Sequence, residues 1–263
     1  LIMSFSDHLP VEYYSSEPGQ IKQRNKGIAL LEDSTRLVAT IDDDAEFHKT
    51  AISEMIKFWN SVEPDTAGVG FNVINQDRHK HTWLRGVLGV SVPEPGKVIK
   101  CGLATSIANV KQNIKSDWLN GGATVWRREI LRDNLHAEIN SRWAVYEDLI
   151  FSYPIGKKYP LYISKDSKIK VDYSLSSDEN LQTYKYRGKT QCIWGGYFVS
   201  INPDMSILKF IYFKLLQLII NLIKGIKKKH KLFVGIGIIQ GLILISHALI
   251  VKKGFSKIIE DNT

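Results

Sequence analysis

The chain has 263 residues, of which 44% are hydrophobic, 10% aromatic and 24% charged. This composition fits one globular domain, or one domain with an appendage, and excludes collagen-like, low-complexity and disordered chains. Its two cysteines, Cys101 and Cys192, are too few for a disulfide scaffold or a CxxC metal site, and we expect both to be reduced and structural.

The net charge of +8 lies entirely in the last part of the chain. Residues 206–263 contain ten lysines and two acidic residues, whereas residues 1–205 carry 25 basic and 25 acidic residues. Because the basic segment is also the most apolar, an anionic membrane surface suits it better than a nucleic acid. We therefore expect a neutral body over 1–205, a basic hydrophobic tail over 206–263, and no nucleic-acid partner.

Strands and helices are predicted to alternate along the body, which indicates an α/β sheet. The apolar, β-branched run at 36–41 is typical of a buried parallel strand. The segment 118–126 is predicted to lead through two glycines into a helix. The other predicted strands are 11–14, 69–74, 159–163 and 168–173, and the other predicted helices are 20–31 and 45–59.

Three carboxylates, Asp42, Asp43 and Asp44, directly follow the predicted strand 36–41. Ligands bind at strand ends in α/β sheets, and oxygen ligands at this density suit Mg²⁺ or Mn²⁺. The alternative is that Asp44 caps the following helix. One Asp suffices for a cap, so the triplet favours a further role.

Four short motifs follow one another along the body. Residues 19–28 read GQIKQRNKGI, 41–44 read IDDD, 118–127 read WLNGGATVWR and 146–149 read YEDL. In this order they resemble the Arg-Asn-x-Gly helix start, the D-x-D motif, the Gly-Gly acceptor-side segment and the E-D motif of family 2 glycosyltransferases. The resemblance covers residues 9–200 and implies a GT-A-type, mostly parallel sheet flanked by helices.

The resemblance also implies an activity. Family members transfer a sugar, with inversion, from a nucleotide-sugar such as a UDP-, GDP- or dTDP-sugar, and we expect the acceptor to be a lipid-linked or cell-surface glycan. Asp148 would be the general base, supported by Glu147. Five residues would contact the donor, and three would hold Mn²⁺ or Mg²⁺. The donor contacts are Arg24, Asp42, Asp43, Gly121 and Gly122, and the metal ligands are Asp42, Asp44 and Asp172.

Several of these residues also have a plain structural interpretation. Glu147 and Asp148 fit an exposed helix pair or a cap, Arg24 fits a solvated helix face, and the two glycines fit an ordinary loop. The pair His79 and His81 suggests zinc, but without a third ligand nearby we expect a solvated loop.

The sequence departs from the family in two places. Ten residues precede the first matched strand, so we expect most of the family's N-terminal β-α unit to be missing. Asp172 stands where many members have a histidine. These departures favour an alternative, a non-catalytic membrane-bound module that binds a nucleotide-sugar or glycan.

In the tail, segment 207–223 has a narrow polar stripe that suits a helix lying in a membrane interface. The basic cluster 227–231 follows. Then 232–251 is free of Lys, Arg, Asp and Glu, and Gly237 and Gly241 have G-x-x-x-G spacing. The interpretations are a membrane-attached helical pair, a single span, or a soluble core or oligomer helix. We favour the first, with the body at the cytoplasmic face of the cell membrane.

Overall fold

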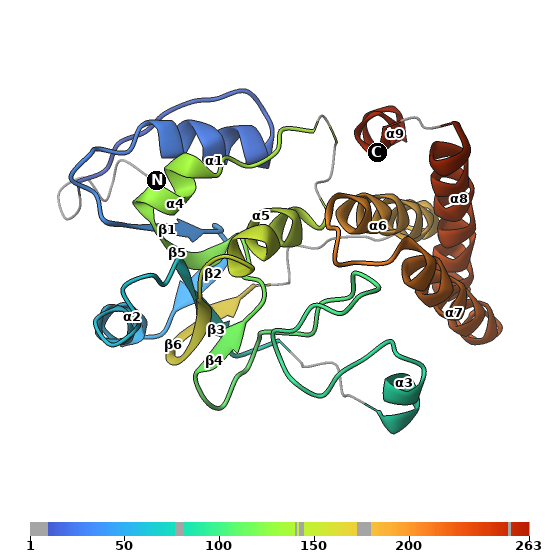
Figure 1. Cartoon of the computed structure of the whole chain (residues 1–263), viewed down its shortest axis with the longest axis horizontal. Coiled ribbons are helices and arrows are strands. Elements are labelled where there is room, and N and C mark those ends of the chain that lie inside the picture. The colour runs from blue at the N-terminus through green and yellow to red at the C-terminus, as the bar shows by residue number, and fades with distance from the viewer. Residues whose placement is uncertain are drawn as a thin grey trace.

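The computed structural model describes residues 10–76, 82–139, 141, 145–172, 180–251 and 254–262. Within these residues the chain is mixed α/β: a sheet with helices on both faces lies beside a layer of C-terminal helices (Figure 1). The predicted loop with His79 and His81 lies outside the described residues. The strands are β1 (Leu37–Ile41), β2 (Ala45–Phe47), β3 (Gly68–Val73), β4 (Ile114–Ser116), β5 (Ala123–Arg127) and β6 (Leu161–Val171).

The sheet is mixed and has the order β1-β5-β3-β6-β2, with β4 also paired to β6. Among the described strands, β3 and β6 pair in parallel and every other pair is antiparallel. The prediction of a mostly parallel sheet is therefore wrong. An apolar run in the sequence indicates that a strand is buried. Whether the strand is parallel or antiparallel depends on which other strand it pairs with in the fold. The run at 36–41 became β1, a half-exposed strand at the end of the strand order.

Several predicted elements have different boundaries. Residues 11–14 form no strand, and 45–59 divides into β2 and the helix α2, so Asp44 lies in a turn and caps no helix. The segment after the two glycines first forms β5 and only then a helix, and the two strands predicted at 159–163 and 168–173 are one strand, β6. For β2, β5 and β6, pairing with a distant strand overrides the local pattern, whereas residues 11–14 belong to no strand pair.

The helices cover both faces of the sheet and then form the C-terminal layer (Figure 1). Their bounds are α1 (Gln20–Ala29), α2 (Ala51–Trp59), α3 (Trp83–Val87), α4 (Arg128–Asp133), α5 (Glu147–Gly156), α6 (Leu181–Ile201), α7 (Ile207–Gly225), α8 (Lys229–Val251) and α9 (Phe255–Asn262).

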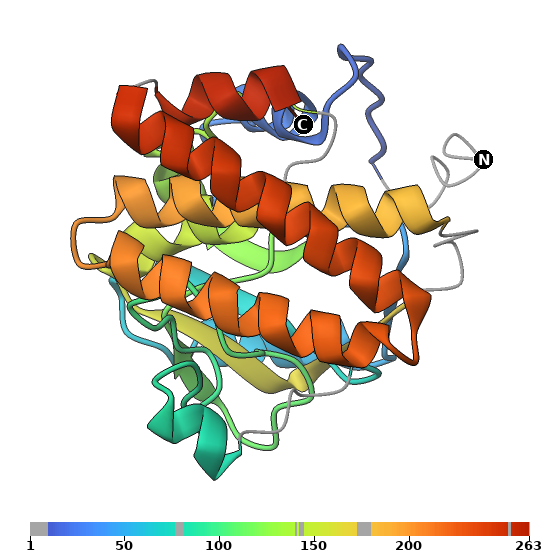
Figure 2. The ribbon, with the colours of Figure 1, turned by 90° about the vertical axis from the view of Figure 1, so that its right-hand side faces the viewer.

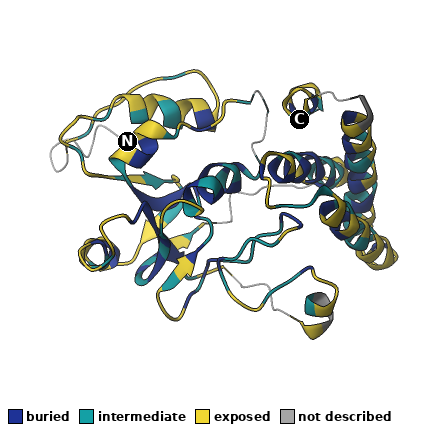
Figure 3. Ribbon diagram, viewed as in Figure 1, coloured by how far each residue is buried: buried dark blue, intermediate teal, exposed yellow. Residues whose placement is uncertain are grey.

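Two hydrophobic clusters hold helices on the sheet. On one face Trp126 and Ile163 pack against Phe151 of α5, and on the other Val69 and Ile169 pack against Met55 of α2. The middle strand β3 is buried along its whole length, as Figure 3 shows. The sheet is therefore a rigid platform for the residues at its strand ends.

The C-terminal helices pack closely on one another (Figure 2). A Cβ atom on Gly241 of α8 would lie 2.5 Å from Cβ of Cys192 on α6, and one on Gly237 would overlap the carbonyl oxygen of Lys185. The G-x-x-x-G spacing thus serves a close helix contact within this chain. Because α6 packs on α8, the helical layer begins at Leu181. The division at residue 205 remains a prediction.

One helix in the described residues, Lys229–Leu249 of α8, is long and apolar enough to cross a membrane. A third of its most apolar window is buried against the protein, and a soluble core helix passes the same test. Membrane association of the tail therefore remains a prediction.

Candidate functional site

The end of β1 and the start of β5 meet because the two strands are antiparallel. Ile41 pairs with Ala123, and the next residues in each direction are Asp42 and Gly122. The Asp42 N–H donates a hydrogen bond of 2.9 Å to the Gly122 carbonyl oxygen. Two motifs that are 80 residues apart in the sequence thus share one strand end.

Arg24 of α1 connects this strand end to α5. Its Nη1 donates to the Glu147 carboxylate, and its Nη2 lies 3.4 Å from Oδ1 of Asp42. The side chain of Arg24 is only 11% exposed, so it does not lie on a solvated helix face. A planar guanidinium has donors in a fork, and therefore one arginine holds both carboxylates.

The two glycines permit close approach of the backbone to these side chains. A Cβ on Gly122 would overlap the Asp42 carboxylate, and one on Gly121 would overlap the Asp148 carboxylate and lie 2.6 Å from Nη1 of Arg24. The Gly121 N–H also donates a hydrogen bond to the Asp148 carboxylate. Both glycines are therefore required for this close packing, and their contact with a donor remains a prediction.

Ser152 ties α5 to the glycine segment, a role that the sequence analysis missed. Its hydroxyl donates to the Asp148 carbonyl oxygen at 2.5 Å and accepts from the Leu119 N–H at 3.0 Å. The side chain of Ser152 is buried. The sequence did contain a signal for this role of Ser152. Asp148 and Ser152 are four residues apart, and residues at this spacing share a helix face.

Asn25 and His136 position α1, and therefore Arg24, against the sheet. The Asn25 side chain accepts from the His136 N–H and donates to its carbonyl oxygen, both at 3.0 Å. The His136 ring stacks on Phe151, with ring centroids 3.8 Å apart. Burial, and secondarily the charge of Arg24, lowers the pKa of His136 to about 4, so this ring is a neutral support at neutral pH.

The carboxylates of the site are electrostatically unusual. Burial chiefly raises the pKa of Asp148 to about 7; the charge of Glu147 adds to this, while Arg24 and the Gly121 N–H oppose it. Burial also raises the pKa of Glu147, against the effect of Arg24. Three carboxylates face one guanidinium, so protonation of Asp148 near neutral pH relieves their repulsion.

Asp43, Asp44 and Asp172 lie at the edge of this arrangement. Asp43 and Asp44 form the turn between β1 and β2, and the Asp172 N–H donates to the Asp44 carbonyl oxygen at 2.9 Å. In the described part of the chain no group of three or more His, Cys, Asp and Glu residues is placed to hold a metal ion. Asp42 is already bound by Arg24, so these donors do not form a metal site by themselves. The metal set of Asp42, Asp44 and Asp172 and the donor contact of Asp43 remain predictions.

The structure thus brings together Arg24, Asp42, Gly121, Gly122, Glu147 and Asp148. A comparison with models of known protein families finds none that matches this chain, and a search of curated proteins finds no relative. The function is therefore argued from this geometry.

Proposed function

We propose that the chain is an inverting glycosyltransferase that moves a sugar from a nucleotide-sugar to a hydroxyl group of a glycan acceptor. The convergence of Arg24, Asp42, the two glycines, Glu147 and Asp148 supports this proposal. The observation that carries it is a half-buried Asp148 carboxyl group beside bare glycine backbone, with a pKa of about 7. A general base works best when its pKa lies near the operating pH.

The reaction needs one displacement. The acceptor oxygen attacks the anomeric carbon as its proton passes to Asp148, and the bond from that carbon to the diphosphate oxygen breaks with its electron pair. A single attack from the opposite side inverts the anomeric centre and needs no enzyme nucleophile. Gly121 and Gly122 leave room for the reacting groups because no side chain covers their backbone.

Glu147 and Arg24 position the base. The Oε2 atom of Glu147 is buried without a hydrogen-bond partner among the described residues. Such an atom is costly to leave unpaired, and it is closed off from an incoming substrate, so Glu147 acts here as a positioning residue. Arg24 keeps Glu147 in place and adds positive charge on the side where the diphosphate would leave.

The charge balance of the site favours an additional cation. Three carboxylates against one arginine would repel a diphosphate. Dependence on Mn²⁺ or Mg²⁺ is therefore part of the proposal, although the ligands present do not form a complete set without the substrate.

One observation supports the alternative that the chain is a non-catalytic binding module. Arg24 is already paired with two carboxylates, and so offers less charge to a departing diphosphate. Calorimetry with UDP, GDP and dTDP, with and without Mn²⁺, tests binding, and release of nucleoside diphosphate from the matching sugar donors tests turnover. If the full chain binds a nucleoside diphosphate but shows no turnover with any glycan acceptor, the result favours the binding module. If the chain shows no binding and no turnover, both proposals are refuted.

We further propose that the C-terminal helices rest on the cytoplasmic face of the cell membrane. The predicted polar stripe of α7 points partly inward, since Lys214 is only 3% exposed, while the apolar residues Leu208, Ile223 and Ile226 are 76%, 63% and 85% exposed. An exposed apolar face beside a lysine cluster suits an anionic lipid surface. Flotation with anionic and neutral vesicles tests this, and equal binding to both would contradict the role of the lysines.

A further inference from the structure

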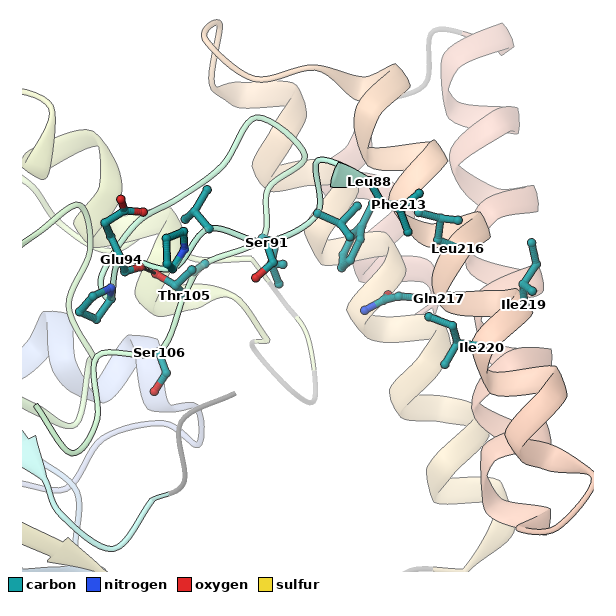
Figure 4. A pocket seen from close by; sticks show the side chains of 16 residues that line it. Leu88, Ser91, Glu94, Thr105, Ser106, Phe213, Leu216, Gln217, Ile219 and Ile220 are labelled. Carbon is teal, nitrogen blue, oxygen red and sulfur yellow. Dashed lines mark hydrogen bonds between the residues drawn. The ribbon is translucent and has the colours of Figure 1, made fainter. Parts of the chain in front are cut away.

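A cavity lies apart from Asp148, between the segment 88–106 and α7 (Figure 4). Its volume is about 480 Å³. The wall formed by α7 is largely apolar and consists of Phe213, Leu216, Ile219 and Ile220, with Gln217 among them. The glycosyl-transfer steps above make no use of this groove.

The opposite end of the groove is polar. Glu94, Thr105 and Ser106 line that end, away from α7 (Figure 4). The Thr105 carbonyl oxygen accepts a hydrogen bond of 3.1 Å from the indole N–H of Trp118. Trp118 begins the segment that leads to Gly121 and also packs against the cluster of Leu149, the residue after Asp148. One hydrogen bond thus connects the polar end of the groove to the segment that leads to Gly121.

The apolar end opens at the surface. Ile219 and Ile220 line the groove and are also 53% and 42% exposed. They lie on the same helix as the exposed Leu208 and Ile223, and the exposed lysines 224, 227 and 228 follow along the chain. A hydrocarbon chain could therefore pass from a lipid surface into the groove without crossing water.

We propose that the groove binds a glycolipid acceptor, with its hydrocarbon chain along α7 and its hydroxyl-bearing head toward Glu94 and Thr105. As an acceptor site, this assignment rests on the proposed glycosyl transfer. The Glu94 carboxylate accepts hydrogen bonds from hydroxyls and repels an anionic head group. The Lys214 ammonium group donates to Oε1 of Gln217 at 3.2 Å, which leaves the amide N–H groups of Gln217 for a ligand. The opening beside exposed apolar residues and lysines selects a membrane lipid as the source.

Calorimetry with octyl glucoside, below its critical micelle concentration, tests the proposal on the full chain without any donor. We expect saturable binding at one site and at least about tenfold weaker binding in Leu216→Trp, because the indole fills the groove. Ile219→Trp, at an exposed position that tolerates a larger side chain, should weaken binding in the same direction. Leu215→Trp is the matched control: Leu215 is on the same helix but outside the groove, and binding should stay unchanged.

The comparison ligands decide what the groove recognises. Methyl glucoside lacks the chain and should bind at least about tenfold more weakly, as should octyl phosphate, whose head is anionic. Three results would each overturn the proposal. The first is that octyl glucoside shows no saturable binding, the second is that the Leu215 variant loses as much affinity as the groove variants, and the third is that octyl phosphate binds as tightly as octyl glucoside. Calorimetry with nucleoside diphosphates on the same variants distinguishes the groove proposal from the glycosyl-transfer proposal. A filled groove should leave the affinity for nucleoside diphosphates unchanged.

Discussion

Asp148 is the residue where activity and stability should move in opposite directions. Asp148→Asn keeps the shape of the side chain but removes the proton acceptor. Losing a positioned general base costs about 10²–10⁴-fold in rate, which corresponds to about 3–5 kcal/mol of activation free energy. Transfer should fall by that factor at saturating acceptor, measured as nucleoside diphosphate released.

At neutral and alkaline pH, Asp148→Asn should have a higher free energy of unfolding than the wild-type chain. Folding raises the pKa of Asp148 from 3.8 to about 7, so the folded chain binds more protons than the unfolded chain between these values. This carboxyl group therefore destabilises the fold progressively as the pH rises from about 4 to about 7, and constantly above that. At 1.36 kcal/mol per pKa unit the upper bound is about 4 kcal/mol.

Urea unfolding at about pH 5 and about pH 8 measures this effect. We expect Asp148→Asn to exceed the wild-type free energy of unfolding more at pH 8 than at pH 5. Asp43→Asn, at an exposed position in the turn after β1, is the control and should change stability by less than about 0.5 kcal/mol at either pH. A variant that loses stability at pH 8, or keeps full activity, would refute the assignment of Asp148 as a general base with a raised pKa.

Three further changes test the surrounding geometry. Gly122→Ala should weaken nucleoside diphosphate binding by about tenfold or more, as measured by calorimetry, because its Cβ overlaps the Asp42 carboxylate and moves this proposed donor contact out of place. Arg24→Lys should lower the free energy of unfolding by about 1–3 kcal/mol, measured in urea, because one ammonium group cannot hold both carboxylates and leaves Glu147 buried and poorly paired. Gly241→Leu should cost at least about 2 kcal/mol in the same assay by separating α6 from α8.

Glycines with free space provide the controls for these variants. A Cβ on Gly27 of α1 would meet nothing within 4 Å, and one on Gly235 of α8 would make only ordinary contacts at 3.4 Å. Alanine at either position should retain binding and stability, or gain slightly through the lower entropy of the unfolded chain. Comparable losses at Gly27 and Gly122 would show that donor binding does not depend on the Asp42 contact.

The sequence alone determined which chemical groups this protein has and where most of its elements lie. The helix α1, the buried strand β3 and the start of α7 all follow local patterns of apolar residues and turns. The motifs around Arg24, Asp42, Gly121 and Asp148 were also identified without a structure, because their residue types carry the chemistry wherever the chain places them. Membrane contact, metal dependence and sugar transfer remain predictions.

Only the tertiary structure decided how these groups are paired. Strand direction depends on connections through space, so β1 lies antiparallel beside β5, and residues 45–47 add to β6 instead of starting a helix. The pKa of Asp148 depends on burial and on the charges of Glu147, Arg24 and Asp42, which three separate segments contribute. Such long-range terms have no signature in a local window of sequence, since they arise only when distant residues exclude water together.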